Sequence, residues 1–148
     1  IIHVLKNKKS KLKKSTRILL AESEDNDPAC AKAIDLERTV SFSIEILNYI
    51  QKRIGSVSRI DEIPKSFPSL VPMIRTISAQ LVDVIPESSQ HLSELSVHLG
   101  SIALDSATIT NAQFDFSQSN TESLLMLDEV KLMVDSKINK QYPHLDFF

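Results

Sequence analysis

Apolar side chains recur every three or four residues along most of the chain. The clearest case is the segment 33–57, where a stripe of aliphatic residues follows one side of a predicted helix. Pro28 suits the first turn of this helix and Asp27 its N-cap. About thirty residues at 1.5 Å each give a helix of roughly 45 Å, which cannot bury its stripe alone. The stripe consists of Leu36, Val40, Ile44, Leu47, Ile50 and Ile54.

The preceding segment has a related pattern. Leu5, Leu12 and Leu19 recur every seven residues, with lysines over most of the remaining surface. Because only a short acidic stretch separates this segment from the long helix, we expect the two to fold back on each other. The prediction is an antiparallel helical hairpin over residues 1–58, with its tip near Asn26.

Prolines interrupt the pattern in the second half of the chain. Residues 59–68 contain two prolines and are predicted as a connector. New apolar stripes then predict short helices over 69–105. Ser69 is the expected N-cap of the first short helix, and Pro86 the expected first residue of the next.

The last part of the sequence predicts a linker and a final helix. Residues 106–118 show no helical period and are predicted as the linker. Ser119 and Glu122 have the spacing of a capping box, which would open a helix over 119–141. Apolar residues occur on more than one side of this helix, so it should be buried on two sides or await a partner. The residues that could meet that partner are Leu124, Leu125, Leu127, Val130 and Leu132.

These elements predict an all-α fold in a single domain of 148 residues. The expected architecture is the hairpin with additional shorter helices, either elongated or folded back into a bundle. Only two glycines and no tryptophan favour helices over a β-sandwich or barrel. An open hairpin would need other copies to cover its stripes, whereas a closed bundle would cover them itself. The periodicity leaves both arrangements open.

Charge is unevenly distributed, although the formal net charge is only −2. Residues 1–20 contain seven cations and no acid. This face suits anionic lipid head groups, at about 1 kcal/mol per lysine, or an acidic surface of a neighbouring copy, while a plain solvated face is the alternative. Nucleic acid is disfavoured, because the segment has no aromatic residue for base stacking. The cations are Lys6, Lys8, Lys9, Lys11, Lys13, Lys14 and Arg17.

Patterns for catalysis or metal binding are weak. Two glycines cannot build a P-loop or a dinucleotide-binding loop, and Cys30 has no histidine close to it in sequence. His91, Glu94 and His98 share one helical face, but a second pair of the kind that di-iron bundles use is missing. We therefore expect no enzyme, no cofactor and no metal. A lone cysteine fits a reducing cytosol, and no apolar run is long enough for a transmembrane helix. Because the chain begins at Ile1, we expect it to be a piece of a longer protein.

Residues 29–109 resemble the ESCRT-III core of archaeal CdvB proteins. The likeness lies in the order of the segments: a long helix, then FPSLVPMIR at 67–75, then LVDVIPE at 81–87, where a proline and an acid join two short helices. The resemblance implies a filament-forming subunit that self-assembles for membrane remodelling and constriction in archaeal cell division. The Lys-rich segment would then contact the membrane or the filament, and the stripe of the long helix would carry self-assembly.

The resemblance also implies partners and a location. The partners would be further copies and related ESCRT-III paralogues, a CdvA-type recruiter, a CdvC-type AAA ATPase and an anionic membrane, contacted directly or through the recruiter. The location would be cytoplasmic, at the inner face of the membrane at the division site. In the last helix, Asp128 and Glu129 stand where an ATPase-binding helix of the family needs arginine and leucine. The alternative function is a non-polymerising helical-bundle adaptor that docks a partner protein.

Overall fold

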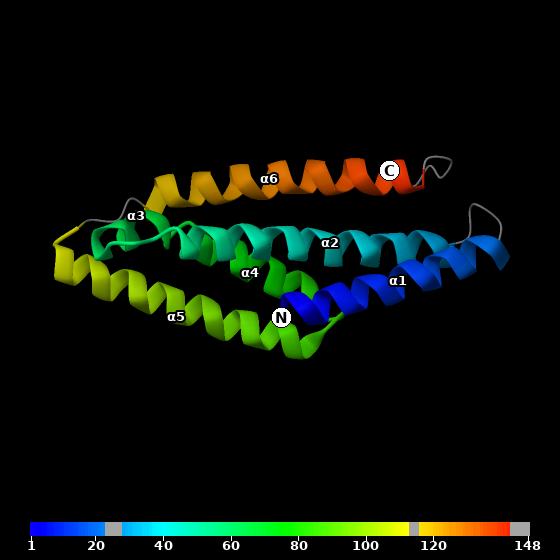
Figure 1. Ribbon diagram of the computed structural model, residues 1–148, viewed down its shortest axis with the longest axis horizontal. Coiled ribbons are helices and arrows are strands. Elements are labelled where there is room, and N and C mark those ends of the chain that lie inside the picture. Colours follow the sequence, from blue (N-terminus) through cyan, green and yellow to red (C-terminus); the bar gives the residue numbers. More distant parts are fainter. Residues whose placement is uncertain (23–27, 113–115, 143–148) are drawn as a thin grey trace. The chain divides into compact units, whose positions relative to one another are not determined.

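Helices make up nearly all of the computed structural model, which describes residues 1–22, 28–112 and 116–142 (Figure 1). No strand occurs within these ranges, so the predicted all-α fold class is confirmed. The elements, in chain order, are α1 (Ile2–Glu22), α2 (Pro28–Gly55), the 3₁₀ turn η1 (Ile60–Glu62), α3 (Ile63–Ser66), α4 (Leu70–Leu81), α5 (Pro86–Thr110) and α6 (Phe116–Gln141).

The chain forms two compact units. Unit 1 comprises residues 1–45 and 130–148, so it combines an N-terminal segment with a C-terminal one. Unit 2 comprises residues 46–129. Two helices are shared between them, because the first part of α2 and the last part of α6 belong to unit 1 and their remainders to unit 2. The prediction of one domain did not include this division.

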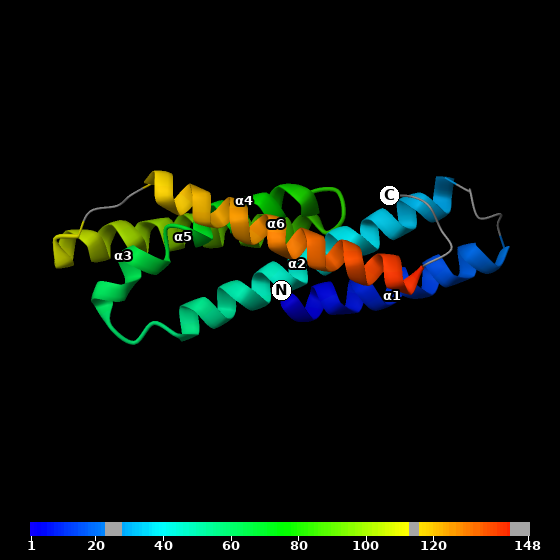
Figure 2. The same cartoon turned by 90° about the horizontal axis from the view of Figure 1, so that it is seen from above.

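In unit 1, α1 and the first part of α2 run in opposite directions, as the predicted hairpin requires (Figures 1 and 2). Pro28 is the first residue of α2, as predicted. The predicted N-cap Asp27 and the predicted tip at Asn26 lie outside the described residues. Of the leucines spaced by seven, Leu5 and Leu12 are buried on the inner side of α1, and Leu19 is half-buried.

The apolar stripe of α2 is covered within this chain. Ile34 and Ile46, which lie off the stripe, are also fully buried, so α2 is covered on more than one side. The stripe can therefore meet another copy only in a different conformation, and its role in self-assembly stays a prediction. Of the stripe residues, Val40, Ile44, Leu47 and Ile50 are buried, and Leu36 and Ile54 are half-buried.

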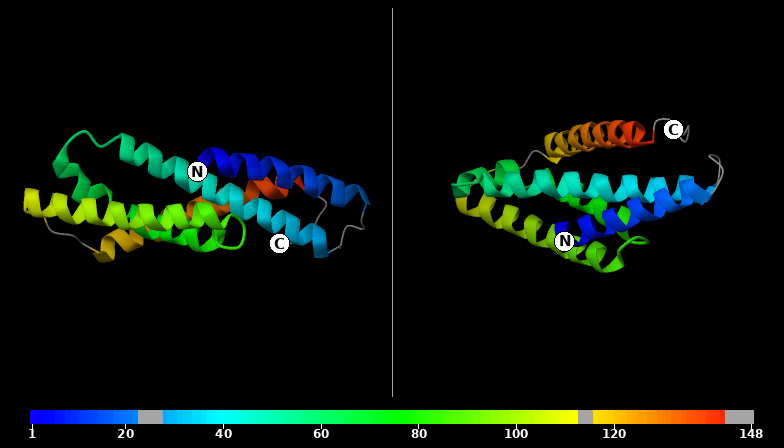
Figure 3. Two further views of the ribbon diagram at one scale, coloured as in Figure 1. Left: turned by 90° about the horizontal axis from the view of Figure 1, so that it is seen from below. Right: turned by 45° about the vertical axis from the view of Figure 1, so that its right-hand side comes forward.

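Unit 2 is organised around α4 and α5, which pack side by side (Figure 3). The chain reverses after Leu81, whose carbonyl accepts hydrogen bonds from the backbone N–H groups of Val84 and Ile85. Pro86 is then the first residue of α5, as predicted. Serine hydroxyls join the two helices: Ser78 Oγ donates to the Ser89 carbonyl at 2.7 Å, and Ser89 Oγ donates to the Ser78 carbonyl at 2.6 Å. Small side chains allow this close approach of two backbones.

The connector is more ordered than predicted. Residues 59–68 contain η1 and α3, and both elements pack against α5. Ser69 occupies the N-cap position of α4 but has a helical backbone, and its hydroxyl donates to the Ser66 carbonyl instead of capping α4. α2 ends at Gly55, three residues before the predicted end of the hairpin.

The predicted linker 106–118 is wrong over most of its length. α5 continues to Thr110 and ends at Asn111, which has a left-handed backbone (φ 55°) and donates its N–H to the Ala107 carbonyl. The inner face of α5 continues through Ser106 and Ala107, whose small side chains do not register as an apolar stripe. This part of α5 therefore has a buried side with helical spacing, but the apolar pattern does not reveal it because the residues are small.

The capping box is also wrong. α6 begins at Phe116, so Ser119 lies inside the helix and cannot cap it. Glu122 is exposed and accepts a long hydrogen bond of 3.4 Å from the side chain of Gln118. A Ser-x-x-Glu pattern on the outer surface of a helix has the same spacing as a capping box, and only the backbone distinguishes them.

Replacing Ser89 tests the close packing of α4 on α5. Ser89→Ala should lower the free energy of unfolding by about 1 kcal/mol, because one hydrogen bond is lost. Ser89→Leu should lower it by about 1 to 3 kcal/mol, because the larger side chain forces the helices apart. Denaturant unfolding measures both. Ser101→Leu, at an exposed position of α5, is the control, and an equal loss there would contradict the packing argument.

Candidate functional site

The outer surface of α1 is basic and partly apolar. Val4, Lys11 and Ile18 are spaced by seven, so they follow one line along the helix, and all three are exposed. Val4 is 48% exposed and Ile18 is 56% exposed. We call the exposed cations of this surface the outer cations. They are Lys6, Lys11, Lys14 and Arg17.

Two of the remaining lysines of α1 line a cavity inside unit 1. Lys8, Lys9 and Lys13 are only half-buried, and two of them line a cavity of about 120 Å³ between α1, α2 and α6. We call it the lysine cavity. Its lining residues are Lys9, Lys13, Ser41, Glu45, Val134, Lys137, Ile138 and Gln141.

Positive charge exceeds negative charge along this lining. Lys137 Nζ lies 3.6 Å from Glu45 Oε1, but neither Lys9 nor Lys13 makes an ion pair among the residues that the structure describes. Burial lowers the pKa of Lys9, and the charge of Lys13 lowers it further, against the opposing effects of Glu37 and Glu45. Lys9 and Lys13 are therefore near each other at the lysine cavity and partly removed from water, whereas the side chain of Lys137 is 63% exposed.

Ser41 adds an unpaired hydroxyl to the same lining. Its side chain is 6% exposed, and its buried Oγ has no hydrogen-bond partner in the described part of the chain. Ser43, two residues further along α2, donates to the Thr39 carbonyl at 3.0 Å, as helical serines commonly do. A buried hydroxyl without a partner destabilises the fold unless something else binds it.

Glu37 is a fully buried carboxylate next to the lysine cavity. It accepts a hydrogen bond from Gln141 Nε2 at 2.9 Å and another from the Tyr142 hydroxyl at 2.8 Å. Burial, together with the hydrogen bond to Glu37 and the charge of Glu37, raises the pKa of Tyr142 to about 12. An ion pair between Arg38 and Asp135 at 3.0 Å also joins α2 to α6 in this unit.

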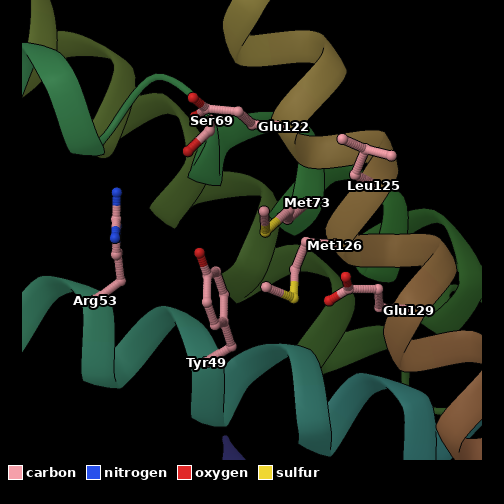
Figure 4. Close-up of a pocket in the computed structure, with 8 residues that line it drawn as sticks. All are labelled: Tyr49, Arg53, Ser69, Met73, Glu122, Leu125, Met126 and Glu129. Carbon is pink, nitrogen blue, oxygen red and sulfur yellow. The ribbon is translucent and has the colours of Figure 1, made fainter.

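Unit 2 contains a second pocket, of about 260 Å³ (Figure 4). Tyr49 of α2, Met73 of α4 and Met126 of α6 converge on its centre, with Arg53 and Glu122 at its edges. Methionine side chains adapt to partners of different shape, which suits a surface that accepts an apolar side chain. We call it the methionine pocket. Its other lining residues are Ser69, Leu125 and Glu129.

The predicted partner residues of α6 divide into two groups. Leu124, Leu125 and Leu132 are exposed, and Leu132 is 71% exposed. Leu127 is half-buried and Val130 is buried, so these two face the chain itself. α6 is therefore covered on one side only, and the exposed leucines remain available to a partner.

Sequence reasoning missed an exposed apolar surface on α5. Large aliphatic side chains face outward there, whereas the inner face consists mainly of serine and alanine. A run of small residues at spacings of three and four was the signal that could have revealed this inversion. The exposed residues are Val97, Ile102, Leu104 and Ile109.

The histidines of α5 and the single cysteine belong to no cluster of metal ligands within the described residues. His91, Glu94 and His98 are exposed, and the described ranges contain no group of three or more His, Cys, Asp or Glu residues that could hold a metal ion. Cys30 is fully buried. No helix in the described part of the chain is both long enough and apolar enough to cross a membrane.

No family model matches the chain, and no solved structure matches it. The likeness to ESCRT-III proteins thus remains a prediction that rests on the order of the sequence segments.

The raised pKa of Tyr142 predicts a loss of stability in alkaline solution. The folded state favours the neutral phenol. The phenol's contribution to the free energy of unfolding is therefore complete below the ordinary pKa of 10 and is lost as the pH rises towards about 12. The difference between these two values corresponds to about 3 kcal/mol. Urea unfolding between neutral and alkaline pH should show this loss in the native chain and not in Tyr142→Phe.

Tyr142→Phe should also be less stable at neutral pH, by about 1 to 3 kcal/mol, because the buried Glu37 loses one donor. The matched control is Tyr49→Phe in unit 2, which leaves both donors of Glu37 in place and should keep the alkaline loss. If the free energy of unfolding had the same pH profile in the native chain and in Tyr142→Phe, the alkaline loss of stability could not be assigned to Tyr142.

Proposed function

We propose that the chain is a self-assembling helical subunit that works at an anionic membrane surface, as members of the ESCRT-III family do. The observation that carries the proposal is the outer surface of α1, where two of the outer cations, Lys11 and Lys14, stand beside exposed Val4 and Ile18. Cations attract anionic head groups, and short aliphatic side chains between them can enter the interface. A helix presenting both kinds of residue suits a lipid surface better than bulk water.

Exposed apolar residues on α5 and α6 support self-assembly. Leu125 and Leu132 on α6 are spaced by seven, and so are Val97 and Leu104 on α5, so each pair follows one line along its helix. Lines of exposed aliphatic residues on helices are typical of surfaces that meet another helix. These surfaces are available in the present conformation, unlike the buried stripe of α2.

The finer parts of the proposal come from the resemblance. They are constriction at the inner face of the membrane in archaeal cell division, with CdvA-type and CdvC-type proteins and ESCRT-III paralogues as partners. Binding of the ATPase through α6 is the weakest part, because the exposed Asp128 and Glu129 place negative charge where the family's helix needs arginine and leucine.

Reversing the outer cations tests the membrane part of the proposal. Changing Lys6, Lys11, Lys14 and Arg17 to Glu should weaken binding to vesicles that contain phosphatidylserine. With about 1 kcal/mol for each lost cation, the loss is about 4 kcal/mol, or roughly a thousandfold. Vesicle pelleting at low salt measures it, and circular dichroism should show unchanged helicity.

The matched control carries the same change of charge elsewhere, as Lys52, Lys65, Lys131 and Lys140 to Glu, all of which are exposed. It should retain more binding than the α1 variant. Equal pelleting of the two variants would mean that net charge alone, and not the surface of α1, determines the binding.

A second candidate function is the helical-bundle adaptor, which docks one partner protein and does not polymerise. The methionine pocket favours it, because exposed Leu125 lines this pocket together with Met73 and Met126 and could contact an apolar side chain of a partner. The two candidates differ in what the purified chain does by itself.

Sedimentation separates these candidates. A self-assembling subunit should form larger particles as its concentration rises, and changing Leu124, Leu125 and Leu132 to Ser should shift association to higher concentration. Ile60→Ser with Val82→Ser, at isolated exposed positions, is the control and should associate as the native chain does. A monomer at every concentration, with or without vesicles, would exclude self-assembly and favour the adaptor.

A further inference from the structure

We infer that the lysine cavity of unit 1 is a binding site for a phosphate group, either inorganic phosphate or the phosphate monoester of a larger molecule. The ammonium groups of Lys9, Lys13 and Lys137 and the Ser41 hydroxyl would hold its oxygens. The inference goes beyond the proposed function and does not require that the chain self-assembles.

Charge is the first argument for an oxyanion. Three ammonium groups from α1 and α6 line the cavity together with one carboxylate, Glu45. Among the described residues, the only ion pair of this lining is the 3.6 Å contact of that carboxylate with Lys137. Glu37 lies nearby, but its oxygens already accept two hydrogen bonds from Gln141 and Tyr142. An anion in the cavity would supply the negative charge that the half-buried lysines lack.

The Ser41 hydroxyl is the second and independent argument. It is buried, it lines the cavity and it has no partner in the described part of the chain. A phosphate oxygen is a strong acceptor for such a hydroxyl and for ammonium groups. A ligand of this kind would therefore satisfy a polar group that is otherwise unsatisfied.

Size selects the class of ligand. A cavity of about 120 Å³ has the volume of roughly four water molecules, at about 30 Å³ each in the liquid. Pockets for drug-sized molecules measure about 300 to 1,000 Å³. The cavity thus admits a tetrahedral oxyanion and excludes a buried nucleotide, so a larger ligand would place only its phosphate here.

Inorganic phosphate is the first probe for the test. It should raise the midpoint of thermal unfolding of the native chain more than chloride at the same ionic strength, because a ligand of the folded state stabilises it. Lys137→Gln should weaken phosphate binding about tenfold in calorimetric titration. Lys140→Gln, at an exposed position three residues further along α6, is the control and should bind as the native chain does.

Ser41→Ala gives the sharpest variant. Removing a hydroxyl that has no partner should leave the phosphate-free chain at least as stable as before, so loss of folding cannot explain a loss of binding. The same variant should bind phosphate about fivefold to tenfold more weakly. Equal phosphate affinity in Ser41→Ala, Lys137→Gln and the native chain would overturn the inference, as would stabilisation by phosphate no greater than by chloride.

Vesicles distinguish the two sources of the phosphate group. Phosphatidic acid exposes a phosphate monoester, whereas phosphatidylserine at matched surface charge does not. A preference for phosphatidic acid that free phosphate competes away, and that Ser41→Ala abolishes, assigns the site to a lipid head group. Phosphate binding without that preference assigns it to a free ligand.

The same measurements separate this inference from the proposed function. Reversal of the outer cations should abolish vesicle binding and leave the affinity for inorganic phosphate unchanged, because those side chains do not line the cavity. Vesicle binding without any phosphate effect would overturn the cavity site alone. Phosphate binding without vesicle binding would overturn the membrane proposal alone.

Discussion

Unit 1 depends on the pairing of one buried carboxylate. Glu37 lies fully buried on α2, and a carboxylate in that position is costly unless donors replace the water that it lost. Both donors, Gln141 and Tyr142, come from the end of α6, about a hundred residues further along the chain. The N-terminal helices therefore cannot form this unit by themselves, and the C-terminal end of α6 is part of their core.

The same constraint positions the lysine cavity. Because the end of α6 is held on α2 at Glu37, its residue Lys137 comes close to Glu45 and faces the same cavity as the half-buried lysines of α1. The basic residues of α1 thus have two different environments. The outer cations face water and suit an extended anionic surface, whereas Lys9 and Lys13 face a cavity that admits only a small group.

Unit 2 packs differently, because small side chains form most of the inner surface of α5. Ser78 and Ser89 bring the backbones of α4 and α5 close together, and each hydroxyl satisfies a carbonyl of the other helix. Leu92 and Leu99 are buried beside these serines and alanines, but four other large aliphatic residues of α5 are left outside. An exposed apolar surface is consequently a result of how this unit packs.

Much of the secondary structure was determined by the sequence alone, since apolar periodicity and the prolines predicted the all-α fold, the first residues of α2 and α5, and the inner leucines of α1. Local patterns failed where small or polar residues form the buried side, as at Ser106 and Ala107, and where a capping pattern stands on an outer surface, as at Ser119 and Glu122. The seven cations of α1 were evident from the sequence, but only the tertiary structure divided them into outer cations and cavity lysines. The physical reason is that the lysine cavity is formed by residues of three helices, among them Ser41, Lys137 and Gln141. The spacing of residues along the chain does not show which helices will pack together.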